Sequence, residues 1–150
     1  MRRLAVLGTV LVLAGCGGDD GGGDTTRAEW AAAANEVCST YGRRITALGT
    51  PTTPAGAEAF IRRAIPVARE EVAKLRELET PEDDAAKIDR MLDQVEQGIG
   101  ALQSVLSARA SGDQAAVDAA TQRGRQASEA SNRAATELGA TDCAAQPGAS

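Results

Sequence analysis

Three cysteines are the side chains of this sequence with the clearest potential for covalent chemistry, and the chain contains no histidine. Cys16 ends a short apolar stretch, whereas Cys38 and Cys143 lie far apart in the rest of the chain. The stretch before Cys16 follows Met1-Arg2-Arg3 and closes with Leu13-Ala14-Gly15. A positive start, an apolar segment and small residues before a cleavage point are the layout of a secretory signal. The sequence therefore predicts an exported protein.

The tetrapeptide Leu13-Ala14-Gly15-Cys16 resembles the lipobox of bacterial lipoproteins. In that family the cysteine thiol receives a diacylglycerol, and cleavage before the cysteine leaves it as the acylated first residue. The resemblance implies that residues 1–15 are a removed signal peptide and that Cys16 anchors the chain on the extracytoplasmic face of a bacterial membrane. Two acyl chains hold a protein stably, since each buried CH₂ contributes about 0.8 kcal/mol, whereas one chain binds only marginally.

Two simpler interpretations compete with the lipobox. A transmembrane anchor needs about 20 apolar residues, and the stretch from Leu4 to Gly15 is shorter and includes Gly8 and Thr9. A conventional secretory signal followed by an incidental Cys16 would release the domain as a free protein. The positive charge before the apolar segment, the short length of that segment and all four positions of the motif together favour the lipobox.

With Cys16 taken by lipid, Cys38 and Cys143 form an even pair in an exported, oxidising setting, which predicts a disulfide between them. Closing a loop of this length stabilises the folded state by about 4.7 kcal/mol at most. The alternative is a pair of free thiols used in redox or metal chemistry. No CxxC motif and no histidine support that alternative.

Other candidate sites have ordinary structural explanations. The absence of histidine excludes Ser-His-Asp and Cys-His catalytic arrangements, as well as the usual zinc and di-iron sites of helical proteins. The carboxylates of Glu82-Asp83-Asp84 could recruit a hard cation, but helix capping explains them better. The pairs Arg43-Arg44 and Arg62-Arg63 could bind phosphate or carboxylate groups, although such pairs are more often solvated helix surface. We therefore predict no metal, no cofactor and no enzymatic activity.

Charge and aromatic content limit the choice of partner. Without Arg2 and Arg3, 14 basic residues face 21 acidic ones, a net charge of −7. This balance argues against binding nucleic acid, which calls for clustered positive charge. The aromatic residues are only Trp30, Tyr41 and Phe60, so a stacking surface for bases or sugars is not expected.

Trp30 lies close in sequence to the predicted lipid attachment at Cys16. Its two interpretations are a buried side chain that anchors the first helix in the core, or a ring that faces the membrane.

The chain after the signal divides into three parts. Residues 16–25 form the lipidated cysteine and a flexible tether, because Gly17 to Asp24 consists only of Gly and Asp. Residues 26–143 carry apolar side chains spaced by threes and fours and form one helical domain. Residues 144–150 are predicted to be a disordered tail.

Four amphipathic segments with clear start and stop signals make up the domain. They cover about residues 26–48, 54–78, 81–111 and 114–138. Thr26 with Glu29 has capping-box spacing, Pro54 follows Thr53 at a first helical position, and Thr80-Pro81 is the strongest helix start in the chain. Pro66 predicts a kink or break of the second helix near Ile65. Short connections between four such helices predict an all-α, up-down-up-down four-helix bundle.

The fourth segment has an unusual inward face, which consists almost entirely of Ala, Gly and Ser. Such a face gains little from burial at roughly 25 cal/mol per Å² of apolar area. A disulfide between Cys143 and Cys38 would hold the fourth helix against the first one, although burial of its small side chains contributes little to their packing. On the third segment, Gly98 and Gly100 could allow close approach of a neighbouring helix.

The sequence as a whole is similar to the small helical lipoproteins of actinobacterial-type genomes. The similarity lies in the lipobox, the polar spacer, the stretch from Trp30 to Cys38, the Thr80-Pro81 helix start and Leu138-Gly139 ahead of Cys143. It implies a location and a fold but no catalytic activity. Our first hypothesis is a lipid-tethered, non-enzymatic module that contacts a protein or glycan partner in the cell envelope. The alternative is a carrier of a small apolar ligand held between helices.

Overall fold

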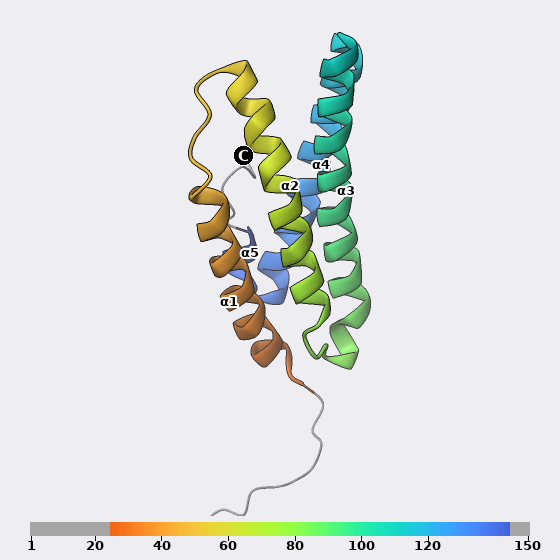
Figure 1. Cartoon of the computed structure of the whole chain (residues 1–150). Helices are drawn as coiled ribbons and strands as arrows, with labels where there is room; N and C mark the ends of the chain where they lie inside the picture. Colours follow the sequence, from red (N-terminus) through yellow and green to blue (C-terminus); the bar gives the residue numbers. More distant parts are fainter. Residues whose placement is uncertain (1–24, 145–150) are drawn as a thin grey trace, which may run out of the picture.

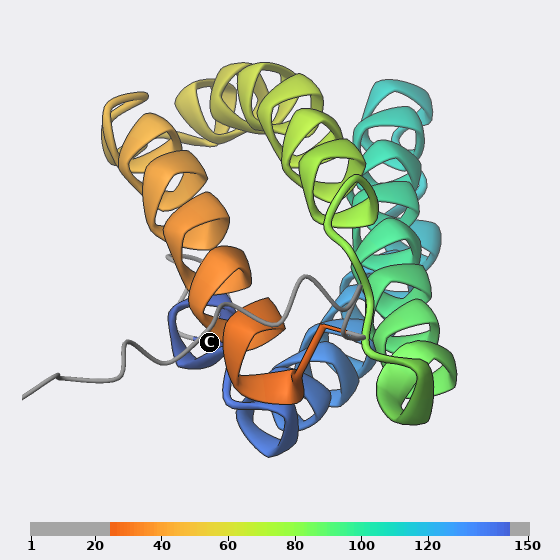
Figure 2. The ribbon, with the colours of Figure 1, turned by 90° about the horizontal axis from the view of Figure 1, so that it is seen from below.

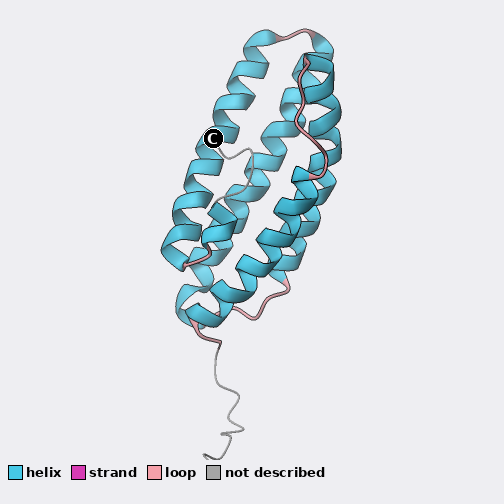
Figure 3. Cartoon of the chain, turned by 90° about the vertical axis from the view of Figure 1, so that its left-hand side faces the viewer, coloured by secondary structure: helices cyan, strands magenta, loops and turns pink. Residues whose placement is uncertain are grey.

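Figure 1 shows a computed structural model of the chain, which describes residues 25–144. This part contains α-helices and connecting turns and no strand (Figure 3). The helices are α1 (Arg27–Thr46), α2 (Pro54–Arg76), α3 (Ala85–Ser111), α4 (Gln114–Leu138) and α5 (Thr141–Ala144), with a 3₁₀ turn η1 (Glu82–Asp84) before α3. The predicted signal peptide, the lipobox with Cys16, the tether up to Asp24 and the tail from residue 145 lie outside the described residues.

The four long helices run alternately up and down and follow one another around the bundle in chain order (Figures 1 and 2). The predicted all-α, up-down-up-down bundle is confirmed. Helix α5 lies between α1 and α4 and contacts both of them. This short helix was not predicted, because Thr141-Asp142-Cys143 has no apolar repeat. It places Cys143 against α1.

Three of the four long helices begin with a side-chain cap, and those of Thr26 and Thr53 lie at helix starts that the sequence predicted. In the capping box, the backbone N–H of Glu29 donates to Thr26 Oγ1 at 3.3 Å, and the N–H of Thr26 donates to Glu29 Oε2 at 2.9 Å. Thr53 Oγ1 accepts from the N–H of Gly56 at 3.0 Å, and Asp113 Oδ1 accepts from the N–H of Ala116 at 2.9 Å. Each cap satisfies a backbone donor that the helix itself leaves unpaired.

The start of the third helix differs from the prediction. Thr80 does not cap it, because its hydroxyl donates to the carbonyl oxygen of Leu78 at 3.2 Å. Pro81 is buried, and the next three residues form the 3₁₀ turn η1. The α-helix then begins at Ala85, and Asp84 at its N-cap position makes no side-chain cap bond. The Asp84 carboxylate is held instead by Arg27 of α1.

No break occurs at Pro66, and α2 is one helix from Pro54 to Arg76. The proline removes one backbone donor, but its ring is exposed to solvent. On either side of it, Ile65 and Val72 are buried and pack together with Ile99 of α3. Because both halves of α2 rest on the same apolar cluster, tertiary packing keeps the helix continuous.

The main core lies at the base of the bundle, the end at which α1 begins. Its largest buried side chains come from α1, α3 and α4: Trp30, Ile88, Met91, Leu92 and Leu138. Trp30 is 1% exposed, so of its two interpretations the buried anchor is confirmed. A second cluster near the α3–α4 turn is built around Val105 and Val117, with Ile61 of α2 packed against it.

The inward face of α4 is small, as predicted, and its close approach to α3 occurs at Gly124. A Cβ atom at Gly124 would lie 3.4 Å from the Cβ of Ala101. The prediction that Gly98 and Gly100 mediate a close approach is wrong, since a Cβ at either position would meet no atom within 4 Å. On the buried face, Ala127, Ser131 and Ala135 leave little apolar area to drive docking.

A disulfide joins Cys38 of α1 to Cys143 of α5, across 105 residues of sequence. The side chain of Asn35 supports the same junction, because its Nδ2 donates to the carbonyl of Gly139 at 3.2 Å and its Oδ1 accepts from the N–H of Asp142 at 2.8 Å. Gly139 has a φ of +84° and ends α4, a conformation that other residues rarely adopt. The junction therefore couples the C-terminal end of α4 to α1.

Replacing Cys38 and Cys143 together by Ala is expected to lower the free energy of unfolding by about 2–4 kcal/mol, because the unfolded chain regains the freedom of a long loop. Urea unfolding followed by circular dichroism measures the difference. Reductant should lower the stability of the wild-type protein and leave the double variant unchanged. Equal urea midpoints for the two proteins under oxidising conditions would contradict the stabilising role of this bond.

Candidate functional site

The candidate site is a shallow groove between α2 and α3, which lie side by side in Figure 1. It consists of two open hollows with volumes of about 560 and 420 Å³. The first hollow is lined by Arg62, Ile65, Gln103, Leu106, Ser107 and Ala110. The lining of the second includes Arg69, Val72, Arg76, Glu96, Ile99 and Gly100, and Gln103 also borders it. We call the two hollows together the α2–α3 groove.

The floor of the groove is apolar and has a regular spacing. Ile65 and Val72 stand one heptad apart on α2, and Ile99 and Leu106 stand one heptad apart on α3. Residues seven apart return to nearly the same helix face, so each helix contributes a straight line of apolar side chains. The groove therefore runs along the length of the two helices.

The rim on α2 is a row of three arginines, Arg62, Arg69 and Arg76, which also repeats every seven residues. Arg76 makes ion pairs of 3.1 Å with both Asp93 and Glu96 of α3. Within the described part of the chain, Arg62 and Arg69 make no ion pair and are exposed. The groove thus offers two free positive charges beside an apolar floor.

The opposite wall of the groove is formed by α3, and at its middle the side chains are small or polar. Gln103 borders both hollows and presents an amide, which can donate and accept hydrogen bonds. Gly100 lies one turn before it, and a Cβ there would meet no atom within 4 Å. The absent side chain at Gly100 therefore contributes to the depth of the second hollow.

Sequence reasoning missed this groove and assigned Arg62-Arg63 to solvated surface. The structure separates the pair: Arg62 lines the groove, whereas Arg63 donates to the carbonyls of Ala59 and Leu48 at 3.3 Å. The available signal was the heptad repeat of Arg62, Arg69 and Arg76. It was not decisive, because the sequence does not tell which neighbouring helix lies beside that row.

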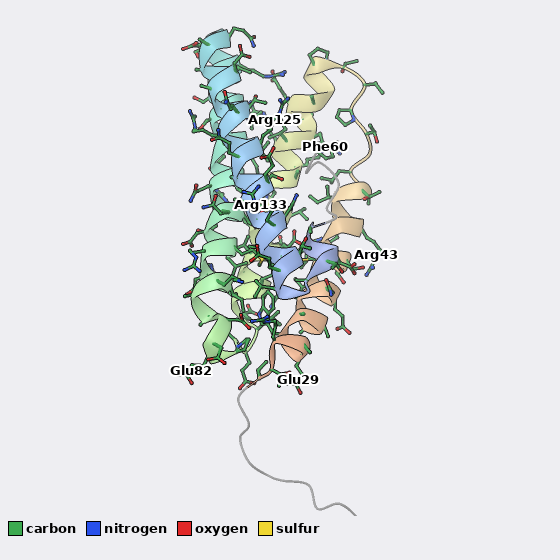
Figure 4. All side chains as sticks on the ribbon, turned by 180° about the vertical axis from the view of Figure 1, so that it is seen from behind. Glu29, Arg43, Phe60, Glu82, Arg125 and Arg133 are labelled. Atoms are coloured by element: carbon green, nitrogen blue, oxygen red, sulfur yellow. A yellow bond between two sulfur atoms is a disulfide. The ribbon has the colours of Figure 1, made fainter. Side chains whose placement is uncertain are left out.

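The other predicted anion site, Arg43-Arg44, is occupied by internal contacts. Arg44 Nη1 lies 2.6 Å from Glu70 Oε2, and its guanidinium stacks on the ring of Tyr41 at 4.7 Å. Arg43 donates to the hydroxyls of Ser39 and Thr40 on its own helix, and Figure 4 shows it at the outer side of α1. Arg44 therefore links α1 to α2, whereas the contacts of Arg43 stay within α1.

The carboxylates of Glu82-Asp83-Asp84 do not act as a unit. The guanidinium of Arg27 makes two hydrogen bonds to Asp84, from Nε at 2.6 Å and from Nη2 at 2.7 Å. These bonds hold the pKa of the buried Asp84 carboxyl below its usual range. Glu82 and Asp83 are exposed, and Glu82 lies at the base of the bundle in Figure 4. Within residues 25–144, no group of carboxylates or cysteines could hold a metal ion.

Two polar groups inside the bundle were also not predicted. Glu71 of α2 is only 9% exposed, and burial raises the pKa of its carboxyl to about 7. The indole Nε1 of Trp30 is buried and has no hydrogen-bond partner among the described groups. The burial of Glu71 was not visible in the sequence, since Glu71 follows Glu70 and reads as part of a charged helix surface. The burial of Trp30 was one of its two interpretations, but the absence of a partner for its Nε1 was not predicted.

The comparisons with known proteins returned no match. No family model, no curated protein and no solved structure matches this chain. None of the helices in the described part has the length and apolar character needed to cross a membrane. The similarity to bacterial lipoproteins accordingly stays a prediction that rests on the lipobox and the chain pattern.

Replacing Glu71 by Gln is expected to change how stability depends on pH. A carboxyl whose pKa is higher in the folded chain than in the unfolded chain stabilises most below about pH 4.5. That contribution is lost as the pH rises through about 7, and a rise in pKa from 4.5 to about 7 corresponds to about 3 kcal/mol. Melting temperatures between pH 4 and 8 should fall in the wild type and stay flatter in Glu71→Gln.

The matched control for this measurement is Glu36→Gln, which alters an exposed carboxylate on α1. It should keep the wild-type pH profile. Identical profiles for Glu71→Gln and the wild type would show that Glu71 carries no burial cost.

Proposed function

We propose that this protein is a lipid-anchored, non-enzymatic module of the bacterial cell envelope that binds a partner protein in the α2–α3 groove. The observation that carries the binding role is the groove itself, with its apolar floor and its two arginines that lack ion-pair partners in the described part. The anchor and the location rest on Leu13-Ala14-Gly15-Cys16.

The groove suits a protein partner because its form is that of a helix-binding surface. Amphipathic helices bind by laying an apolar face into a groove, with polar contacts along the edges. The floor supplied by Ile65, Val72 and Ile99 is continuous over both hollows, and the rim is charged. None of the side chains that line the two hollows is aromatic, which makes the groove a poorer match for a glycan.

The arrangement of the bundle is compatible with a tether at its base. Arg27 in the first turn of α1 binds Asp84 of η1, so α1 begins at the same end of the bundle as α3. Under the proposal the bundle base lies nearest the bilayer, and the groove extends away from it along α2 and α3. A partner could then dock from the side without displacing the anchor.

Replacing Cys16 by Ala is expected to abolish lipid labelling and to move the protein out of the membrane fraction, because both acyl chains would be lost. Metabolic labelling with a palmitate analogue, followed by fractionation, checks this. Cys38→Ala is the control and should leave labelling intact. A labelled Cys16→Ala protein, or an unmodified Cys16 thiol in the native protein, would contradict the anchor.

Replacing Gly100 by Leu is expected to fill the second hollow and to reduce partner capture at least about tenfold, a loss of roughly 1.4 kcal/mol. The measurement uses a photo-crosslinker in place of Gln103, which borders both hollows, and quantifies crosslinked partner from intact cells. Gly98→Leu is the matched control, since Gly98 is equally open on α3 but lines neither hollow.

Both substitutions favour helix formation, because leucine is a better helix former than glycine. Circular dichroism should therefore show both variants folded. Equal crosslinking by Gly100→Leu and Gly98→Leu would contradict the groove as the binding site. A bound small molecule in a native mass spectrum, in place of a protein, would support the carrier alternative.

A further inference from the structure

We infer that the occupant of the α2–α3 groove is an acidic amphipathic helix, with carboxylates that pair with Arg62 and Arg69. The inference rests on the proposed function, because it specifies the partner chemistry for the same groove. Its support comes from the length of the groove, the spacing of its charges and an ion-pair arrangement that the bundle already contains.

The length of the groove matches a short helix. From Arg62 to Arg76 the rim spans fifteen residues of α2, and the fourteen rises between them correspond to about 21 Å at 1.5 Å per residue. This length accommodates about four helical turns. The floor residues repeat every seven positions on both walls, so a helix with apolar residues at the same repeat would meet them in register.

The spacing of the two free arginines favours a helix over a single-headed amphiphile. Arg62 and Arg69 stand one heptad apart, which places them roughly 10.5 Å apart along α2. A fatty acid or a lysophospholipid brings only one anionic head and would leave one arginine unpaired. A helix with acidic residues seven positions apart offers two carboxylates at the required spacing.

Arg76 shows how such a pairing is made. It is the third member of the same row, and it is already bound by Asp93 and Glu96 from a neighbouring helix. Those carboxylates stand three residues apart on α3, as they would on one face of a bound helix. Arg62 and Arg69 are exposed and have the same chemistry, but the described part of the chain provides no carboxylate for them.

The overall charge of the protein makes this row selective. The whole chain has a net charge of −5, so its overall charge opposes the approach of an acidic peptide. The arginine row beside an apolar floor provides both attraction and burial. Charge complementarity would thus set the position of the bound helix as well as its affinity.

The test uses three synthetic 21-residue peptides and the mature chain held in nanodiscs of phosphatidylcholine. The first peptide repeats a heptad with Leu at the two core positions, a and d, and with Glu at the positions that border this apolar stripe on either side. The second has Lys in place of Glu, and the third is the acidic peptide with a central Pro that breaks the helix. Fluorescence anisotropy should show binding of the first peptide, with an affinity that falls with salt, and at least tenfold weaker binding of the other two.

The double variant Arg62→Glu/Arg69→Glu should bind the acidic helix at least about tenfold more weakly and should gain affinity for the Lys peptide. The matched control is Arg125→Glu/Arg133→Glu, which makes the same change in net charge. Arg125 and Arg133 are exposed on α4 and line neither hollow (Figure 4). This control should keep wild-type binding of the acidic peptide, and circular dichroism should show both variants folded.

Equal loss of binding in both double variants would overturn the inference, because the net charge of the protein would then explain the binding without the position of Arg62 and Arg69. Absence of binding by the wild type, or equal binding of the helical and Pro-broken peptides, would overturn it as well. So would dimerisation of the chain through this groove. If Gly100→Leu still blocks the Gln103 crosslink in these cases, the groove remains a binding site and only the acidic helix is wrong. An unchanged crosslink would instead refute the proposed function itself.

Discussion

The covalent link between Cys38 and Cys143 compensates for the weakest element of this bundle. Between Val117 and Leu138 the inward face of α4 is built from Ala, Gly and Ser, so burial of that middle part contributes little free energy. The helix gains tight packing instead, as Gly124 against Ala101 shows. The disulfide and the side chain of Asn35 then join the end of α4, through α5, to α1. The closed ring of helices depends on this junction.

The base of the bundle contains its largest cluster of buried apolar side chains. Trp30 and Leu138 are almost fully buried there, and Arg27 binds Asp84 with two short hydrogen bonds. The face formed by α2 and α3 has a different character, since its arginine row is only partly neutralised. A well-packed base and a face with two arginines that are unpaired within the described part would suit a module that is held at one end and recognises a partner along its side.

The helix pattern of the sequence predicted most of the fold, because apolar residues spaced three and four positions apart lie on one helix face, which must be buried. The failures have a common physical cause. Pro66 does not break α2, since the cluster around Ile65 and Val72 holds both halves of the helix. Asp84 reads as a cap but binds Arg27, which lies 57 residues earlier in the chain. In each case a contact between distant segments overrides a local preference.

The sequence alone determined the four long helices, the caps of three of them and the even pair of cysteines, because these depend on residue types and short spacings. The predicted lipid anchor at Cys16 likewise depends on four adjacent residues. Only the tertiary structure decided which polar groups remain available. It buried Glu71, engaged Arg44 with Glu70, and left Arg62 and Arg69 beside an open apolar groove. The reason is physical: exposure and pairing depend on which helices are neighbours, and a helix repeat does not specify the neighbour.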